Sequence, residues 1–224
     1  KPSKPINLFD CATSQKVIGQ DKFLNAFEKI LNHGAYCQGP ETKELETKLA
    51  AFSNAKYCTS CASGTDALIL PLMAWDVKPG DAVFVSSFTF VASAEAPVLL
   101  GATPIFVDSD PDTYNMDPKD LQRAIDEVKK EGKLNLKAVI AVDIFGNPCD
   151  YDEIKRIAHA NGMKVLSDAA QAYGSEYKGV RAGNIADMTS TSFYPTKPLA
   201  CYGDGGAVFT HQFGVFDKNF FAFF

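Results

Sequence analysis

A lysine held between two prolines is the residue of this sequence whose surroundings most suggest chemistry. It is Lys197, within the segment 192–199, with Pro195 before it and Pro198 directly after it. Pro198 favours extended backbone angles at the lysine, and Pro195 stiffens the approach to it. A lysine fixed in a partly dry site loses its proton readily, so it can attack an aldehyde and later act as a general base. The alternative is a solvated loop lysine, which is the commoner case for a single lysine.

Asp168 follows an apolar, strand-like run at residues 163–166. A buried carboxylate without a partner is costly, so a cation is expected beside it, and none is close in the sequence. A protonated ring nitrogen of a bound heteroaromatic group would fit, through a charge-assisted hydrogen bond of about 1.5–3 kcal/mol. The alternative is that Asp168 caps a following turn.

A possible phosphate site follows another strand-like segment, residues 56–59. The sequence there is Ser63-Gly64-Thr65-Asp66, at the start of an expected helix. Gly64 lets the backbone approach a ligand, the helix start offers unpaired N–H groups, and the Thr65 hydroxyl adds a donor. The alternative is a plain helix start capped by Ser63 or Thr65. The sequence lacks the G-x-x-x-x-G-K-[ST] motif, which excludes a P-loop nucleotide hydrolase.

Together, a phosphate site, a carboxylate for a ring nitrogen and a nucleophilic lysine are the parts that hold pyridoxal 5'-phosphate (PLP). In such a site the lysine forms an imine with the cofactor, and the carboxylate keeps the ring nitrogen protonated. The combination is far more specific than any one of its members.

The elements that must position these residues alternate between helix and strand. Helices are expected at 22–32, 41–52, 89–100, 117–130 and 150–161. Strands are expected at 82–85, 104–107, 137–145, 163–166, 189–193 and 206–210. This order predicts an α/β fold in which a mostly parallel sheet carries helices on both faces. Ligands of such sheets bind beyond the carboxyl ends of the strands, where all three candidate groups fall. Residues 127–136 are expected to include a long loop.

Composition excludes several classes of protein. The chain has 224 residues, 46% of them hydrophobic and 22% charged, with a formal net charge of −5. This composition is typical of a globular protein and gives no basic surface for nucleic acid or an anionic membrane. No apolar run could span a bilayer, and the first ten residues do not resemble a signal peptide, so a cytoplasmic location is expected. No metal is expected, because the cysteines and histidines lack the spacing of a metal site.

The sequence closely resembles the DegT/StrS-type family of PLP-dependent nucleotide-sugar aminotransferases, from about residue 6 to residue 210. The stretches that carry the resemblance are 63–68, 87–92, 101–117, 168–171 and 192–206. The resemblance implies the large domain of fold type I, here residues 21–224, preceded by an N-terminal arm, residues 1–20. Chains of this family are longer, so the C-terminal small domain is expected to be missing.

The resemblance also implies roles for individual residues. Lys197 is implied as the lysine bound covalently to the cofactor, and Asp168 as the carboxylate facing its pyridine nitrogen. Relatives with histidine in place of this lysine are dehydratases, so Lys197 indicates an aminotransferase.

Five further cofactor contacts are implied by the same resemblance. Gln171 is expected near the ring hydroxyl and Phe90 stacked on the ring. The phosphate group is expected to bind Gly64, Thr65 and Ser192.

The substrates implied are glutamate and a UDP-linked keto sugar, either a 3-keto hexuronic acid or a 4-keto sugar. The product would serve bacterial surface polysaccharide synthesis, such as O-antigen and lipopolysaccharide, and the enzyme would be a homodimer. Six phenylalanines lie among the last twelve residues, and such an apolar end is expected to be buried or to pair with another chain. The alternative function is that of a shortened, non-catalytic homologue with a binding or assembly role.

Overall fold

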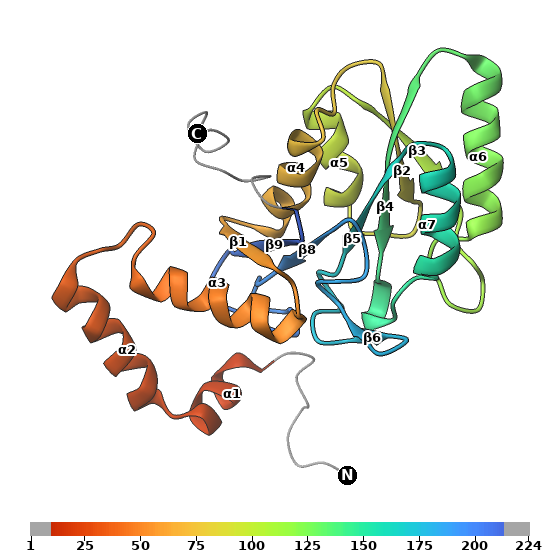
Figure 1. Ribbon diagram of the computed structural model, residues 1–224. Helices are drawn as coiled ribbons and strands as arrows, with labels where there is room; N and C mark the ends of the chain where they lie inside the picture. The colour runs from red at the N-terminus through yellow and green to blue at the C-terminus, as the bar shows by residue number, and fades with distance from the viewer. Residues whose placement is uncertain (1–9, 213–224) are drawn as a thin grey trace, which may run out of the picture. The chain divides into compact units, whose positions relative to one another are not determined.

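The computed structural model describes residues 10–212 (Figure 1). These residues divide into two compact units, with the boundary between Leu45 and Glu46. The first unit contains α1 (Cys11–Ile18), α2 (Gln20–His33) and the start of α3 (Pro40–Ser53). The helices predicted at 22–32 and 41–52 are therefore confirmed, and Pro40 opens the second of them, where its missing N–H costs nothing. Helix α1 was not expected from the sequence. The apolar phenylalanines at the C-terminus lie outside the described residues.

The second unit is built on one sheet of seven strands in the order β1-β9-β8-β5-β4-β2-β3. Its strands are β1 (Tyr57–Cys61), β2 (Asp81–Ser86), β3 (Thr103–Val107), β4 (Asn135–Val142), β5 (Lys164–Asp168), β8 (Met188–Ser192) and β9 (Gly206–Thr210). Strand β9 runs antiparallel to both of its neighbours, and the other pairs are parallel. A small hairpin is formed by β6 (Glu176–Tyr177) and β7 (Val180–Arg181). The predicted, mostly parallel sheet is confirmed.

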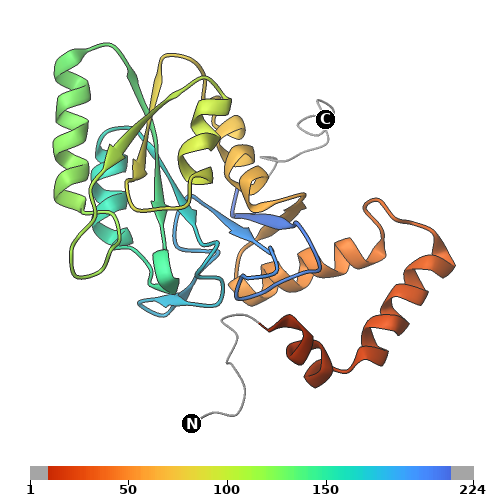
Figure 2. The same cartoon turned by 180° about the vertical axis from the view of Figure 1, so that it is seen from behind.

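Helices cover both faces of this sheet (Figures 1 and 2). The helices are α4 (Gly64–Ala74) and α5 (Ala92–Leu99) on one face, and α6 (Pro118–Glu131) and α7 (Tyr151–Ala160) on the other. Successive residues of a strand point to opposite faces, so Val83 and Val85 pack with α4 and α5, while Phe84 packs with α6 and α7. This arrangement leaves the carboxyl ends of the parallel strands at one edge of the sheet.

Strand β4 ends three residues earlier than predicted. It ends at Val142, and Ile144–Gly146 form a short 3-10 turn in which Phe145 has φ 55°, a left-handed angle that no strand contains. At Asp143 the backbone N–H still donates to the carbonyl of Asp168 on β5 at 3.0 Å. The Asp143 carboxylate accepts the N–H of Cys149 at 2.9 Å, which folds the chain back. The apolar, β-branched sequence therefore extends beyond the strand itself.

Two helix boundaries also differ from the prediction. Helix α5 begins at Ala92 rather than at residue 89, and it is preceded by a tighter turn in which the carbonyl of Phe90 accepts the N–H of Ser93 at 3.1 Å. Helix α6 continues to Glu131 and ends at Gly132, which has φ 64°. Since β4 starts at Asn135, the long loop predicted at 127–136 is wrong.

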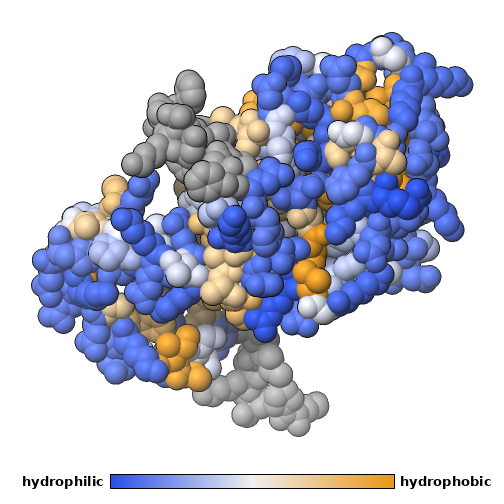
Figure 3. Space-filling model, viewed as in Figure 1, coloured by the Kyte–Doolittle hydropathy of each residue, from blue (hydrophilic) through white to orange (hydrophobic). Residues whose placement is uncertain are grey.

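Polar side chains predominate on the face of the molecule seen in Figure 3, with apolar residues in separate patches between them. Among the described residues, no helix combines the length and the apolar composition that crossing a bilayer requires.

Candidate functional site

Two residues predicted to bind a cofactor end neighbouring strands at the carboxyl edge. Asp168 is the last residue of β5, and Ser192 is the last residue of β8. The strands are paired in parallel, with Asp168 opposite Ser190. Helix α4 begins nearby at Gly64, which lies directly against Ser192. The fold therefore brings three distant parts of the sequence to one place.

Asp168 is buried, with 6% of its surface exposed, and both of its carboxylate oxygens accept hydrogen bonds. Oδ2 accepts the hydroxyl of Ser93 at 2.8 Å, and Oδ1 accepts the N–H of Ala170 at 3.2 Å. Burial raises the pKa of Asp168, while these two hydrogen bonds and the positive charge of Lys197 oppose that rise. A cation at this carboxylate would stabilise its charged form further.

Ser93 belongs to a chain of hydroxyl groups that the sequence analysis did not identify. Thr89 Oγ1 and Ser93 Oγ lie 2.8 Å apart. Because Ser93 gives its single hydroxyl proton to Asp168, Thr89 must be the donor to Ser93. The sequence signal was two small hydroxyl residues four apart, within the helix that was expected at 89–100. The contact with Asp168 comes from the tertiary fold and has no sequence pattern.

Lys197 closes a turn that begins at the end of β8. Its N–H donates to the carbonyl of Tyr194 at 2.9 Å, which places Pro195 at the second position of the turn. Proline is favoured at this position because its φ angle is already fixed. The side chain is half-buried, and its charge is close enough to act on the carboxyl group of Asp168. The structure therefore brings the predicted lysine and the predicted carboxylate together.

The predicted phosphate residues also lie side by side. A Cβ atom added to Gly64 would lie 2.6 Å from the Cβ of Ser192, so no larger residue fits there without displacement. Ser63 caps α4, since its Oγ accepts the N–H of Asp66 at 3.1 Å. The N–H groups of Gly64 and Thr65 then remain in the first helical turn, where no carbonyl of the same helix can reach them. Such a helix start suits an anion.

Phe90 and Gln171 occupy the exposed rim of this region. Phe90 is 72% exposed, and its carbonyl accepts the N–H of Ser93 at 3.1 Å. Gln171 is also exposed, and its carbonyl lies 3.2 Å from where a Cβ on Gly146 would be.

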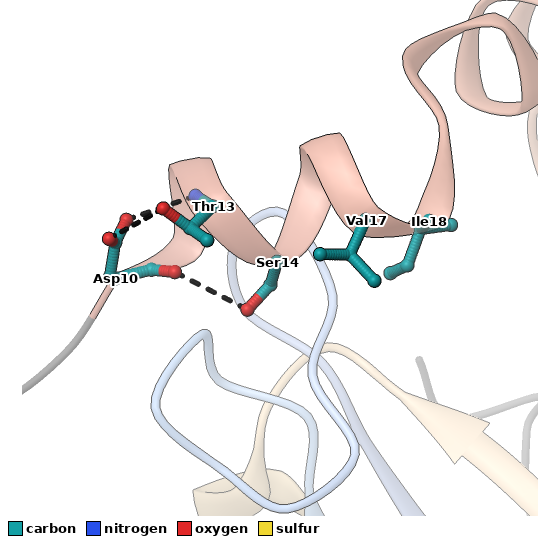
Figure 4. A pocket seen from close by; sticks show the side chains of 5 residues that line it. All are labelled: Asp10, Thr13, Ser14, Val17 and Ile18. Atoms are coloured by element: carbon teal, nitrogen blue, oxygen red, sulfur yellow. Dashed lines mark hydrogen bonds between the residues drawn. The ribbon is translucent and has the colours of Figure 1, made fainter.

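Figure 4 shows a separate hollow of about 540 Å³ beside α1, lined by Asp10, Thr13, Ser14, Val17 and Ile18. Its polar groups are already used to cap the helix, since Asp10 accepts the N–H of Thr13 at 3.0 Å. Within residues 10–212, no three histidine, cysteine or acidic side chains gather in a way that could hold a metal ion.

Comparison with known proteins assigns the chain to a family. The DegT/DnrJ/EryC1/StrS aminotransferase family matches residues 18–218. The chain belongs to this family. A UDP-2-acetamido-2-deoxy-3-oxo-D-glucuronate aminotransferase from Pseudomonas aeruginosa is 48% identical over 207 residues, which cover 92% of this chain and 55% of the relative.

Solved structures of DegT/DnrJ/EryC1/StrS aminotransferases have the same fold. One from Brucella abortus superposes with a TM-score of 0.92 at 44% identity, over 94% of this chain and 56% of that chain. A protein from Streptococcus pneumoniae, described as the putative sugar aminotransferase Spr1654 in its PLP form, has a TM-score of 0.72 at 34% identity, over 82% of this chain and 49% of that chain. This chain spans about half the length of the family members that it matches.

Proposed function

We propose that this chain is the cofactor-binding part of a PLP-dependent aminotransferase that transfers an amino group from glutamate to a UDP-linked keto sugar. The observation that carries the proposal is the buried carboxylate of Asp168, held at the carboxyl edge within electrostatic reach of Lys197. A structural carboxylate does not need a half-buried lysine braced by proline beside it.

The residues fit PLP in both charge and shape. Asp168 is a buried anion whose pKa rises through burial, so a protonated ring nitrogen would relieve a cost that the chain now carries. At the same edge of the sheet, backbone and ligand can approach closely at the start of α4 and the hydroxyl of Ser192, since Gly64 has no side chain. We assign the phosphate to Gly64, Thr65 and Ser192.

The roles of the chain's own groups follow from this placement. When bound, PLP supplies an electron sink that stabilises negative charge beside the transferred nitrogen. Asp168 would keep the ring nitrogen protonated, while Ser93 holds the carboxylate in position. Lys197 would bind the cofactor through Nζ, and its free amine would carry a proton as a general base. Phe90 would cover one face of the ring and Gln171 would reach its hydroxyl.

The sugar specificity follows the relative of highest identity given above. That relative is described as acting on a 3-oxo-glucuronate linked to UDP, which favours a 3-keto hexuronic acid over a 4-keto sugar. We also propose a homodimer, a cytoplasmic location, and a product used in surface polysaccharides such as O-antigen and lipopolysaccharide.

The test is amino transfer by the chain reconstituted with PLP. With glutamate and UDP-2-acetamido-2-deoxy-3-oxo-glucuronate, we expect 2-oxoglutarate and the amino sugar in equal amounts, and neither from Lys197→Ala. Lys178→Ala is the matched control, because Lys178 pairs with Asp152 on the surface. A chain that binds PLP but forms no 2-oxoglutarate from glutamate would instead support a non-catalytic homologue.

A further inference from the structure

Three aromatic rings form a compact group at the carboxyl edge, beside the site described above. They are Phe88, Tyr114 and Phe145, here called the aromatic cluster. Their ring centroids lie 5.8, 5.9 and 6.0 Å apart, so each ring contacts the other two. Yet Phe88 is 46% exposed, Tyr114 51% and Phe145 73%. Rings that pack together and still face water are available to a further flat partner.

Two residues of the aromatic cluster have strained backbone angles. Tyr114 has φ 62° and Phe145 has φ 55°, left-handed angles that bulky residues rarely adopt. The amide of Asn115 donates to the carbonyls of Asn147 at 3.1 Å and Pro148 at 3.2 Å, which ties the loop of Tyr114 to the loop of Phe145. Strain that the surrounding structure maintains tends to mark functional sites.

The aromatic cluster is joined directly to the proposed cofactor site. Its residues follow β2, β3 and β4, and β4 pairs with β5, which ends in Asp168. Gly146, next to Phe145, packs on the backbone carbonyl of Gln171. Thr89, next to Phe88, begins the hydroxyl chain that reaches Asp168. The cluster thus lies one to three strands from that carboxylate, or about 5–15 Å in strand spacings.

We propose that the aromatic cluster stacks the pyrimidine base of the nucleotide-sugar substrate. This inference rests on the proposed function and names the part of the substrate that the chain recognises. The ribose and the pyrophosphate separate the base of a sugar nucleotide from its sugar, so the base site is expected a few strands from the reacting carbon. Every base has a π face, and stacking on aromatic side chains is a common way to hold one.

Size favours a base over a second protein chain. Aromatic side chains of about 150–250 Å² each, exposed to these fractions, present roughly 250–400 Å² in total. A stable interface between two proteins needs about 800 Å² on each side. The area matches one small flat ligand.

Charge favours the base end of the nucleotide over its phosphates. The loop that carries Tyr114 also carries Asp108, Asp110 and Asp112. Hydrogen bonds from the backbone and hydroxyl of Thr113 lower the pKa of Asp110, so this loop stays anionic at neutral pH. An anionic loop repels a pyrophosphate and accepts a neutral ring, so the phosphates must lie away from Tyr114.

The experiment is a titration of the PLP-free chain with UDP, followed by calorimetry and by NMR of the uracil protons. Tyr114→Ala and Phe145→Ala should each weaken UDP binding by about 5- to 150-fold. Uridine should show the same dependence, since it keeps the base and lacks the phosphates. Phe145→Tyr keeps a ring and should bind within about threefold of the parent chain; Phe106→Ala, a 55% exposed phenylalanine outside the cluster, should bind like the parent.

Three results would overturn the inference. The first is that the parent chain shows no saturable UDP binding, and the second is that all variants bind UDP equally. The third is that the cluster variants keep their UDP affinity but sediment as a smaller species, which would assign the cluster to a contact between two copies of the chain. If Phe145→Ala does not fold, the comparison of Phe145→Tyr with Phe145→Leu replaces it. The inference and the proposed function can fail separately. Base stacking does not need Lys197, so UDP should still bind to Lys197→Ala. If UDP binds but no amino group is transferred, only the proposed function is wrong.

Discussion

The two halves of the carboxyl edge satisfy their side chains in different ways. At the ends of β5 and β8, Asp168 and Ser192 are buried, and protein groups already hydrogen-bond them. In the loops after β2, β3 and β4, the rings of the aromatic cluster contact one another but remain about half exposed or more. One half of the edge therefore buries polar groups, and the other half exposes apolar groups.

The folded chain needs the half with the buried polar groups for its own stability. Buried polar groups must be paired even without a ligand, because an unpaired one costs about 1–3 kcal/mol. Exposed rings cost little and gain contacts when a ligand arrives. Changes in the polar half should therefore reduce stability or chemistry, and changes in the aromatic cluster should reduce ligand affinity.

The largest effect is expected for Asp168→Asn. Asparagine cannot hold a ring nitrogen in its protonated form, so the half-reaction with glutamate should slow by roughly 100- to 10,000-fold while PLP still attaches. Stopped-flow absorbance measures the rate, with the surface variant Asp152→Asn as the control. Equal rates in Asp168→Asn and the parent chain would remove the assigned role of Asp168.

Gly64→Ala tests the close approach between α4 and β8. The new Cβ would lie 2.6 Å from Ser192 Cβ, so the helix or the strand must move, at a cost of about 1–3 kcal/mol. Gly203→Ala is the control, because nothing lies within 4 Å of its Cβ position and its φ is not left-handed. Urea unfolding should separate the two variants; equal stability would show that the approach is looser than described.

Ser93→Ala tests the hydroxyl chain. It removes one of the two hydrogen bonds to Asp168, so the free energy of unfolding should fall by about 1–3 kcal/mol and the pKa of Asp168 should rise further. Ser190→Ala is the matched control, since this buried hydroxyl donates to the carbonyl of Ser167. Carbon-13 NMR of the Asp168 carboxyl group would contradict the account if its titration were unchanged in Ser93→Ala.

Asp143 provides a pH test of the polar half. Burial raises the pKa of Asp143 to about 6, against the hydrogen bonds from Tyr151, Cys149 and Ser167. The folded chain thus holds this proton more tightly than the unfolded chain, whose aspartates titrate near pH 3.9. The titration of Asp143 should therefore lower the free energy of unfolding as the pH rises from about 4 to about 6.

In Asp143→Asn this decline should be absent. The difference in unfolding free energy between parent and variant should change by about 1–3 kcal/mol between about pH 4 and about pH 7. Urea unfolding at several pH values measures it. A difference that does not depend on pH would show that Asp143 stays charged throughout.

The smallest effect on stability is expected for Phe145→Gly. Glycine relieves the left-handed φ of 55°, worth about 1–3 kcal/mol, and the ring contacts that are lost are worth about 0.5–1.5 kcal/mol. The two nearly cancel, so thermal unfolding should stay within about 1 kcal/mol of the parent chain. A loss above about 2 kcal/mol would mean that the aromatic cluster supports the fold itself.

Local signals in the sequence account for much of the fold. Asp117 and Pro118 predict the start of α6, the helix expected at 150–161 corresponds to α7, and alternation of helix and strand predicts the parallel sheet. These features depend on neighbouring residues or on periodicity. The end of β4 could not be predicted in this way, because the buried carboxylate of Asp143 turns a chain whose composition favours a longer strand.

The candidate site likewise contains residues that local sequence identifies and residues that only tertiary contacts identify. Lys197, Asp168 and Gly64 stand out by their local sequence, and the structure places them in one region. Ser93 could not be found, because its contact joins residues 75 positions apart. The aromatic cluster likewise joins three loops, and only tertiary packing brings its rings together.

The most direct test is borohydride reduction of the chain with PLP, followed by peptide mass spectrometry. We expect one reduced cofactor adduct, on the peptide containing Lys197, and its disappearance in Lys197→Ala. A label on another lysine, or none at all in a folded chain saturated with PLP, would contradict this expectation.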